Sequence, residues 1–259
     1  MTAFLIAVQF LTCLPVPLRL KIDATMMGRS MRWFPAVGAL IGLGLALIDA
    51  ALVPVLSPEL RAALLVGLLI VLTGALHIDG LMDSCDALLA PVPAERRLEI
   101  LWDSRVGSFA IVGAATALLL KYAAILAIPS ASRVVTLVAL VALSRWSMVY
   151  AAVRYPAARS TGLGHAYKAG VGPRELAIAT ALVVIAVLPS GVAGLAALVL
   201  AWVTTVLLAR AIMSKIPGLT GDTYGAISEC VEIAAAMWLP VFHRIIYEIS
   251  GGAIPIIWP

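Results

Sequence analysis

The sequence predicts an all-α, polytopic integral membrane bundle in a single domain of residues 1–259, and three observations support this fold class. Hydrophobic residues make up 63% of the 259 residues and charged residues only 12%, about half the charged share of soluble domains. Apolar runs approach about 20 residues, the length that crosses a bilayer as a helix. Basic residues gather in alternate connections between these runs, as in chains that cross a membrane repeatedly.

We expect seven transmembrane helices, because only helices satisfy the backbone of such runs inside a bilayer. A short apolar N-terminal segment precedes them. Its positive residues follow its apolar part, the reverse of a signal peptide, so we expect a retained interfacial or half-inserted helix. No internal repeat or linker divides the chain. The expected spans are residues 33–54, 61–78, 108–128, 134–153, 175–191, 195–213 and 230–248.

The longer connections, 79–107, 154–174 and 214–229, are polar and rich in glycine. They and the N-terminal segment carry most of the basic residues, so the positive-inside rule places them in the cytoplasm. The C-terminal residues 250–259 are then expected outside. The basic residues of the cytoplasmic set are Arg19, Lys21, Arg29, Arg32, Arg96, Arg97, Arg105, Arg154, Arg159, Lys168, Arg174, Lys215 and, at the edge of a span, Arg210, against Arg61, Arg133 and Arg244 on the other side.

Composition also excludes several function classes. The net charge of +4 follows from topology, and the basic residues form no dense cluster with interleaved aromatics, so a nucleic-acid partner is not expected. Cys13, Cys85 and Cys230 lack the spacing of a disulfide framework or a zinc site. They are expected to be free thiols.

Three aspartates follow an apolar run in the stretch HIDGLMDSCDALLA, residues 77–90. On a helix Asp79, Asp83 and Asp86 share one face, because they are four and seven residues apart. A solvated acidic helix start gives the same spacing, but charge at the edge of a span is costly and usually functional. Because Mg²⁺ is usually held by a few carboxylates and substrate phosphates, we expect a magnesium site and a phosphate-bearing substrate.

The following stretch AERRLEILWDSRVGSFA predicts an amphipathic helix with Glu95, Glu99 and Asp103 on one stripe. An exposed face paired with neighbouring arginines accounts for the two glutamates. Asp103, at the entry to the next span, is a candidate fourth metal ligand. Arg105 at the same edge suits a phosphate, which a guanidinium binds bidentately, although it could also only snorkel.

Histidine 77 lies on the helical face opposite the aspartates. A local hydrogen bond and a general-base role are both open for His77. Lys121 and Arg145 fall within spans, so they are expected to face the bundle interior or a cavity.

Two further loops carry candidate phosphate-binding residues. The stretch GLTGDTYGAISE precedes the last span, and a glycine-rich turn at a helix start can hold phosphate. The loop at 154–174 is basic and could neutralise a polyphosphate, although topology alone also explains its charge. The candidates are Gly221, Asp222 and Thr223 in the first stretch, and Arg154, Arg159, His165 and Lys168 in the second.

Six stretches together resemble the cobalamin synthase family, collinearly and over nearly the whole chain. They are FLTCLPVP, RWFPAVGALIG, GALHIDGLMDSCDALL, ERRLEILWDSRVGSFA, SRWSMVYAAVRYPAARSTGLGHAY and GLTGDTYGAISE. The resemblance implies an inner-membrane enzyme of coenzyme B12 assembly. It would transfer the adenosylcobinamide phosphate of adenosylcobinamide-GDP to α-ribazole or α-ribazole 5′-phosphate, release GMP and use Mg²⁺. Cys13 and Tyr224 depart from the family pattern but leave the carboxylates intact.

Residue by residue, the resemblance and the spacing predict one site. Mg²⁺ is held by Asp79 and Asp83 with Asp86 and Asp103, and one of these carboxylates takes the proton of the attacking hydroxyl. The catalytic candidates are Asp83, Asp79 and His77.

Two alternatives belong to other classes. A CDP-alcohol phosphatidyltransferase also places aspartates and a glycine at a helix end, but no Ala-Arg follows DGLM here. A transporter would place ionisable residues at mid-membrane and show repeated halves; here only Lys121, Arg145 and Asp49 qualify as intramembrane charges, and the acidic cluster is at the membrane edge. A homo-oligomer, or association with other cobalamin-assembly enzymes, stays open.

Overall fold

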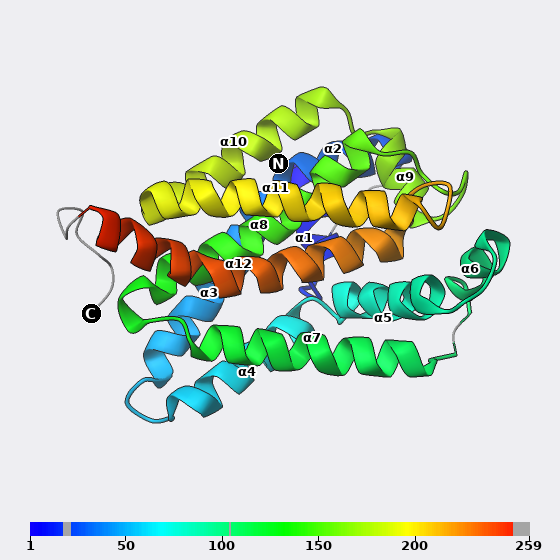
Figure 1. Ribbon diagram of the computed structural model, residues 1–259. Coiled ribbons are helices and arrows are strands. Elements are labelled where there is room, and N and C mark those ends of the chain that lie inside the picture. Colours follow the sequence, from blue (N-terminus) through cyan, green and yellow to red (C-terminus); the bar gives the residue numbers. More distant parts are fainter. Residues whose placement is uncertain (18–21, 104, 251–259) are drawn as a thin grey trace.

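The described residues of the computed structural model, 1–17, 22–103 and 105–250, are helical and contain no β-strand. Several of the long helices run roughly in the same direction, and others are inclined to them (Figure 1). The predicted all-α bundle is therefore confirmed.

The elements, in chain order, are α1 (Thr2–Leu11), α2 (Ala24–Ser30), η1 (Met31–Trp33), α3 (Phe34–Leu52), α4 (Pro58–Leu72), α5 (Leu76–Leu89), α6 (Ala94–Ile100), α7 (Ser108–Leu126), η2 (Ser130–Ser132), α8 (Arg133–Arg154), α9 (Leu163–Ala169), α10 (Pro173–Val187), η3 (Leu188–Ser190), α11 (Gly191–Met213) and α12 (Gly221–Ile249).

Five helical segments of the described chain are long and apolar enough to cross a membrane, and a bent pair makes six. The chain is a multi-pass membrane protein. The predicted count of seven is not confirmed: the expected fifth and sixth spans lie in one apolar helical stretch, residues 173–213, in which the chain turns back at η3 between α10 and α11 (Figure 1).

The expected second span, 61–78, ends early. Helix α4 stops at Leu72, and α5 leaves at 88° to it. Gly74 and Ala75 adopt positive φ values of 61° and 59° at the bend, a conformation that ends a helix. The bend gives α5 a direction of its own, and α5 carries the three aspartates.

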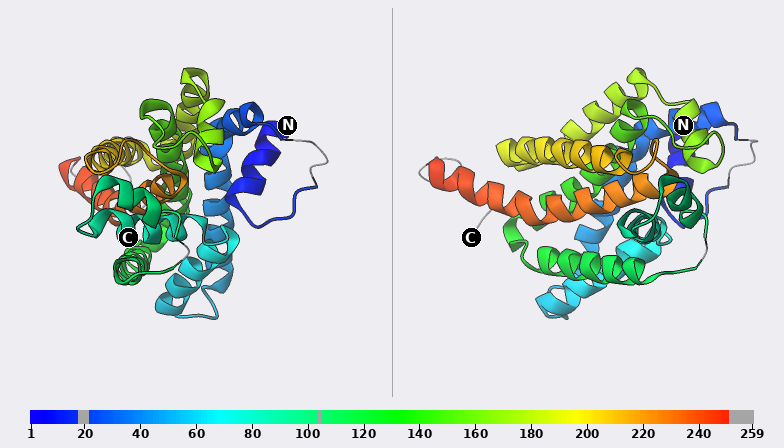
Figure 2. Two further views of the ribbon diagram at one scale, coloured as in Figure 1. Left: turned by 90° about the vertical axis from the view of Figure 1, so that its right-hand side faces the viewer. Right: turned by 45° about the vertical axis from the view of Figure 1, so that its right-hand side comes forward.

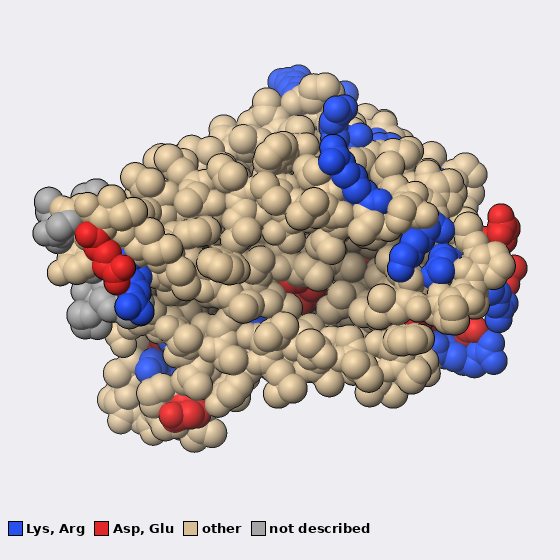
Figure 3. All heavy atoms as spheres, viewed as in Figure 1, with Lys and Arg blue, Asp and Glu red and all other residues tan. Residues whose placement is uncertain are grey.

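Charged side chains gather at the two ends of the bundle and leave a broad apolar belt between them (Figure 3). The end that holds α6, α9 and the start of α12 is the end of the long connections (Figures 1 and 2). Arg19, Lys21 and residues 251–259, which entered the topology prediction, lie outside the described residues.

The N-terminal segment forms the expected short apolar helix, α1, of 10 residues. Its ring-bearing face packs on the chain that leads into α3: Phe10 stacks on Phe34 at 5.6 Å, and Phe4 meets Trp33 edge-on at 5.7 Å between ring centroids. Helix α1 is therefore part of the bundle wall.

Helix α12 begins at Gly221, nine residues before the expected span. Thr220 caps it: its Oγ1 accepts the backbone N–H of Thr223, while Thr223 Oγ1 accepts that of Thr220 at 2.8 Å. This reciprocal cap fixes the helix start at the polar end of the bundle. Glu229, at the end of the expected loop 214–229, and Glu232, near the start of the expected span 230–248, consequently lie inside one long helix.

The predicted interior placement of Lys121 and Arg145 is confirmed, since they are 2% and 1% exposed. Lys121 Nζ lies 2.6 Å from Glu229 and 2.7 Å from Glu232. Arg145 lies 3.2 Å from Glu232. These four side chains, the buried ion cluster, link α7, α8 and α12. A separate buried group joins Asp49 to Arg61 and Arg133 at 3.0 and 2.6 Å.

Candidate active site

The three aspartates of α5 lie on one helix as predicted, and Gly80 determines what faces them. A Cβ at Gly80 would lie 2.6 Å from the carbonyl oxygen of Asp222, too close for any other residue. The start of α12 therefore packs directly on α5. This contact brings Asp222 beside the acidic face, and Asp83 lies within electrostatic range of both Asp79 and Asp222.

Asp222 is positioned by the first turn of α12. Thr220 Oγ1 lies within hydrogen-bonding distance of Asp222 Oδ2, at 3.3 Å. An acidic side chain here also suits the positive end of the helix dipole. Asp222 was predicted from the sequence as a phosphate-site residue; the structure places it among the carboxylates.

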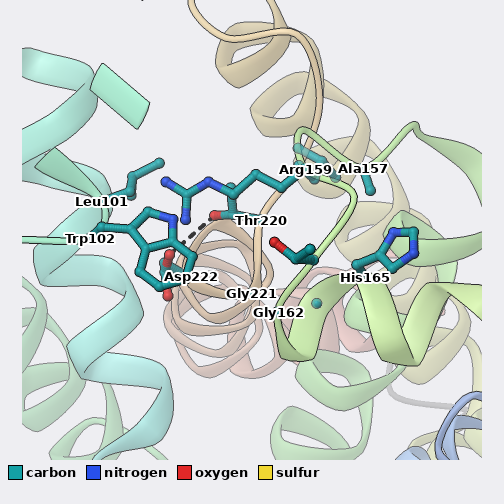
Figure 4. A pocket seen from close by; sticks show the side chains of 12 residues that line it. Leu101, Trp102, Ala157, Arg159, Gly162, His165, Thr220, Gly221 and Asp222 are labelled. Carbon is teal, nitrogen blue, oxygen red and sulfur yellow. Dashed lines mark hydrogen bonds between the residues drawn. The ribbon is translucent and has the colours of Figure 1, made fainter. Parts of the chain in front are cut away.

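An outer cavity of about 230 Å³ adjoins this carboxylate group at Asp222. Loops from three parts of the chain contribute its walls: the turn after α6, the loop before α9 and the start of α12 (Figure 4). Its polar and aromatic lining includes Trp102, Arg159, Thr161, His165, Thr220 and Asp222.

An inner cavity of about 120 Å³ lies on the other side of the same residues. Gly164, Gly221 and Asp222 line both cavities, so the two chambers share a rim. The inner lining is mostly apolar and includes Phe10, Phe34, His77, Asp79, Tyr167 and Tyr224. His77 and Asp79, expected on opposite helical faces, therefore border one space.

Arg159 is the cation closest to the carboxylates in the outer cavity. It extends from its loop toward Trp102 and Asp222 (Figure 4). Its guanidinium carbon lies 4.8 Å from the centre of the Trp102 ring, and it also donates to the carbonyl of Leu98. Partial burial lowers the pKa of Arg159, but an arginine remains cationic. The position suits a phosphate bound between Arg159 and the carboxylates.

The chain matches the sequence model of the cobalamin-5-phosphate synthase family over residues 3–240. It belongs to that family. An adenosylcobinamide-GDP ribazoletransferase of Stutzerimonas stutzeri (strain A1501) is 43% identical over 92% of this chain and 98% of its own. Proteins of the same name from Roseiflexus sp. (strain RS-1) and Geotalea daltonii are 39% and 38% identical, over 88% and 91% of this chain and 85% and 96% of theirs. No solved structure shows a significant match.

Not every residue predicted for this family site lines the two cavities. Asp86 accepts the backbone N–H groups of Gly107 and Ala110 at 2.6 and 2.9 Å. Its carboxylate thus caps the start of α7, where orphan N–H groups need acceptors. This capping role by itself accounts for an aspartate at position 86, with no need for it to bind a metal.

Asp103 does not continue the stripe of Glu95 and Glu99, because α6 ends at Ile100; the prediction of one longer helix was wrong here. Asp103 instead binds the guanidinium of Arg105, with Nη2 at 2.6 Å. That contact lowers the pKa of Asp103 to about 2. Asp103, predicted as a metal ligand, and Arg105, predicted to bind phosphate, therefore bind each other in this structure.

Some of the other predicted binding residues line the outer cavity, and others hold helix ends in place. Lys168 donates to the carbonyls of Ala152 and Tyr155, which satisfies the end of α8. Thr223 is fully buried in the cap of α12. Arg154 is exposed at the end of α8. Gly221, Asp222 and Arg159 line the outer cavity.

Among the described residues, no three His, Cys, Asp or Glu side chains converge as a complete metal site. Mg²⁺ rarely needs such a set, since one or two carboxylates with waters and substrate phosphates suffice. Asp79 and Asp222 both border the inner cavity, and Asp83 is their neighbour. These oxygen donors fit Mg²⁺ provided that a bound diphosphate completes the coordination.

Substituting Gly80 by alanine is expected to lower activity at least tenfold while the protein still inserts into membranes. The new methyl group would meet the backbone of Asp222, which cannot move aside as a flexible side chain can. It would separate α5 from α12 at the carboxylates. Turnover and thermal stability in detergent would be compared with those of Gly67→Ala, where a Cβ meets open space. Full activity of Gly80→Ala would contradict the close contact.

Proposed function

We propose that this chain is an adenosylcobinamide-GDP ribazoletransferase. It joins the adenosylcobinamide phosphate of adenosylcobinamide-GDP to α-ribazole or its 5′-phosphate and releases GMP. The observation that supports this most is the pair of cavities that share Asp222, with Asp79 lining the inner one. A reaction between two large substrates needs two adjoining binding spaces with the reacting groups between them.

The residues in and beside the two cavities have different roles in this proposal. Asp79 or Asp83 accepts the proton of the attacking ribose hydroxyl, one that is free in both α-ribazole and its 5′-phosphate, since a carboxylate within reach is sufficient for general-base catalysis. Arg159 binds phosphate oxygens from the outer cavity, where it stabilises the charge that develops on the departing GMP. Phosphoryl transfer depends chiefly on such positioning and charge stabilisation.

Asp79, Asp83 and Asp222 would hold Mg²⁺ together with the substrate diphosphate. The metal would supply neutralisation of phosphate charge. We favour Asp222 over Asp86 and Asp103 for this set, because those two carboxylates are engaged by the start of α7 and by Arg105.

We further propose that the carboxylate end of the bundle faces the cytoplasm and that the membrane is the bacterial inner membrane. The basic residues of the long connections support this orientation through the positive-inside rule. The α6 and α9 connections, which carry several of them, lie at this end (Figure 3).

Purified full-length protein in nanodiscs should release GMP from adenosylcobinamide-GDP and α-ribazole, with a matching cobalamin product. Chelation by EDTA should reduce the rate at least about a hundredfold, since metal neutralisation of phosphate charge contributes several kcal/mol, and added Mg²⁺ should restore it. The measurement is chromatography of both products. Failure to form product, with CMP release from CDP-diacylglycerol and an alcohol instead, would overturn the proposal in favour of a lipid synthase.

A further inference from the structure

The walls of the inner cavity are aromatic. Phe10 of α1, Phe34 of α3 and Tyr167 of α9 come from three separate helices and contact one another, with centroid distances of 4.4 Å from Tyr167 to Phe10 and 5.9 Å to Phe34. Aromatic rings held in this way offer edges and faces to a flat ligand. The chamber is built for a group unlike the phosphates expected outside.

Two polar side chains in this chamber have no hydrogen-bond partner among the described residues. They are His77, at both ring nitrogens, and Tyr224, at its hydroxyl, and they are only 1% and 4% exposed. Leaving such groups unpaired costs about 1–3 kcal/mol each. Buried polar atoms without partners are rare and call for an explanation. Since both residues line the inner cavity, a ligand that enters it can supply the missing hydrogen bonds.

We infer that the inner cavity is the pocket for the aromatic base of the ribazole substrate. This inference rests on the proposed function. It goes further by assigning the ribazole substrate to the inner cavity. A benzimidazole base is flat and largely apolar, and its free ring nitrogen accepts a hydrogen bond. His77 or Tyr224 donates that bond. His77 is thereby assigned to substrate binding rather than to proton transfer.

The size of the chamber fits this occupant. Its volume of about 120 Å³ is close to the roughly 150 Å³ of an engineered cavity that binds benzene. The chamber and the outer cavity share Gly164, Gly221 and Asp222 in their linings, and we place the rest of a bicyclic base and its ribose along this shared edge. The attacking ribose hydroxyl then lies near Asp79 and Asp222, which line the same chamber.

The lining also predicts base selectivity. Adenine brings an exocyclic amine and several ring nitrogens into a chamber that offers few polar partners. Each unmatched polar group of the ligand would lose its hydrogen bonds to water without compensation. An adenine α-riboside should therefore bind at least about tenfold more weakly than α-ribazole.

The test is isothermal titration of α-ribazole into the full-length protein in nanodiscs, without the corrinoid. Tyr224→Phe, which removes only the hydroxyl, and His77→Asn should each weaken binding about tenfold. The Michaelis constant for adenosylcobinamide-GDP should stay within twofold. Tyr150→Phe is the matched control: its hydroxyl accepts a bond from Trp202 on α11, away from both cavities.

Three results would overturn the inference: no binding of α-ribazole by the wild type, unchanged binding in both variants, or a rise confined to the Michaelis constant of the corrinoid. Failure of the proposed function has a different signature. In that case the wild type forms no cobalamin from the two substrates, whether or not α-ribazole binds.

Discussion

Asp83→Asn should reduce GMP release by about 10³-fold, within the range that a positioned acid or base contributes. The substitution keeps the size of the side chain but removes a charge that lies among Asp79, Asp86 and Asp222. It deprives the site of a metal ligand or proton acceptor beside Asp79 and Asp222. The measurement is single-turnover GMP release at saturating substrates and Mg²⁺.

Stability distinguishes this effect from misfolding. Asp83 is repelled by its acidic neighbours, so neutralising it should leave the thermal unfolding temperature unchanged or raise it. Glu99→Gln on α6 is the matched control, because Glu99 is exposed and pairs with Arg96. An Asp83→Asn protein with more than a tenth of wild-type activity would remove Asp83 from the reaction.

Helix content and the acidic face could be predicted because both depend on local sequence. An apolar run and three aspartates at intervals of four and three residues specify a helix face without reference to the rest of the chain. The bend between α4 and α5 was not predicted. It depends on a positive φ at Ala75. This conformation is uncommon for alanine, so an alanine in the sequence does not indicate it.

Partners that lie far apart in the sequence were the hardest to predict. Asp222 joins the carboxylates only because Gly80 lets α12 approach α5. Glu229 lies 108 residues from Lys121, and nothing in its own segment indicates that pairing. The aromatic wall of the inner cavity likewise combines three helices. Two signals were available: glutamates next to an apolar run, and intramembrane cations that require partners.

The buried ion cluster leads to the second large effect. Lys121→Met should destabilise the protein by about 3–5 kcal/mol, the cost of breaking a buried pair by removing one partner. The wild-type cluster is neutral, with the cations Lys121 and Arg145 opposite Glu229 and Glu232. Removing Lys121 leaves one carboxylate uncompensated between α7 and α12. Methionine approximates the length of the lysine stem, so lost packing contributes little.

We expect the stability lost in Lys121→Met to return when the charge balance of the cluster is restored, even though the contact with Glu229 is not. The double variant Lys121→Met, Glu229→Gln restores neutrality and should recover most of the unfolding temperature in detergent, because buried pairs replaced by neutral groups are often tolerated. Arg244→Met provides the control, since its exposed pair with Glu248 should contribute less than about 1 kcal/mol. If the double variant were less stable than Lys121→Met, charge balance would not be the reason for the cluster, and the geometry of the Lys121–Glu229 hydrogen bond would have to explain it.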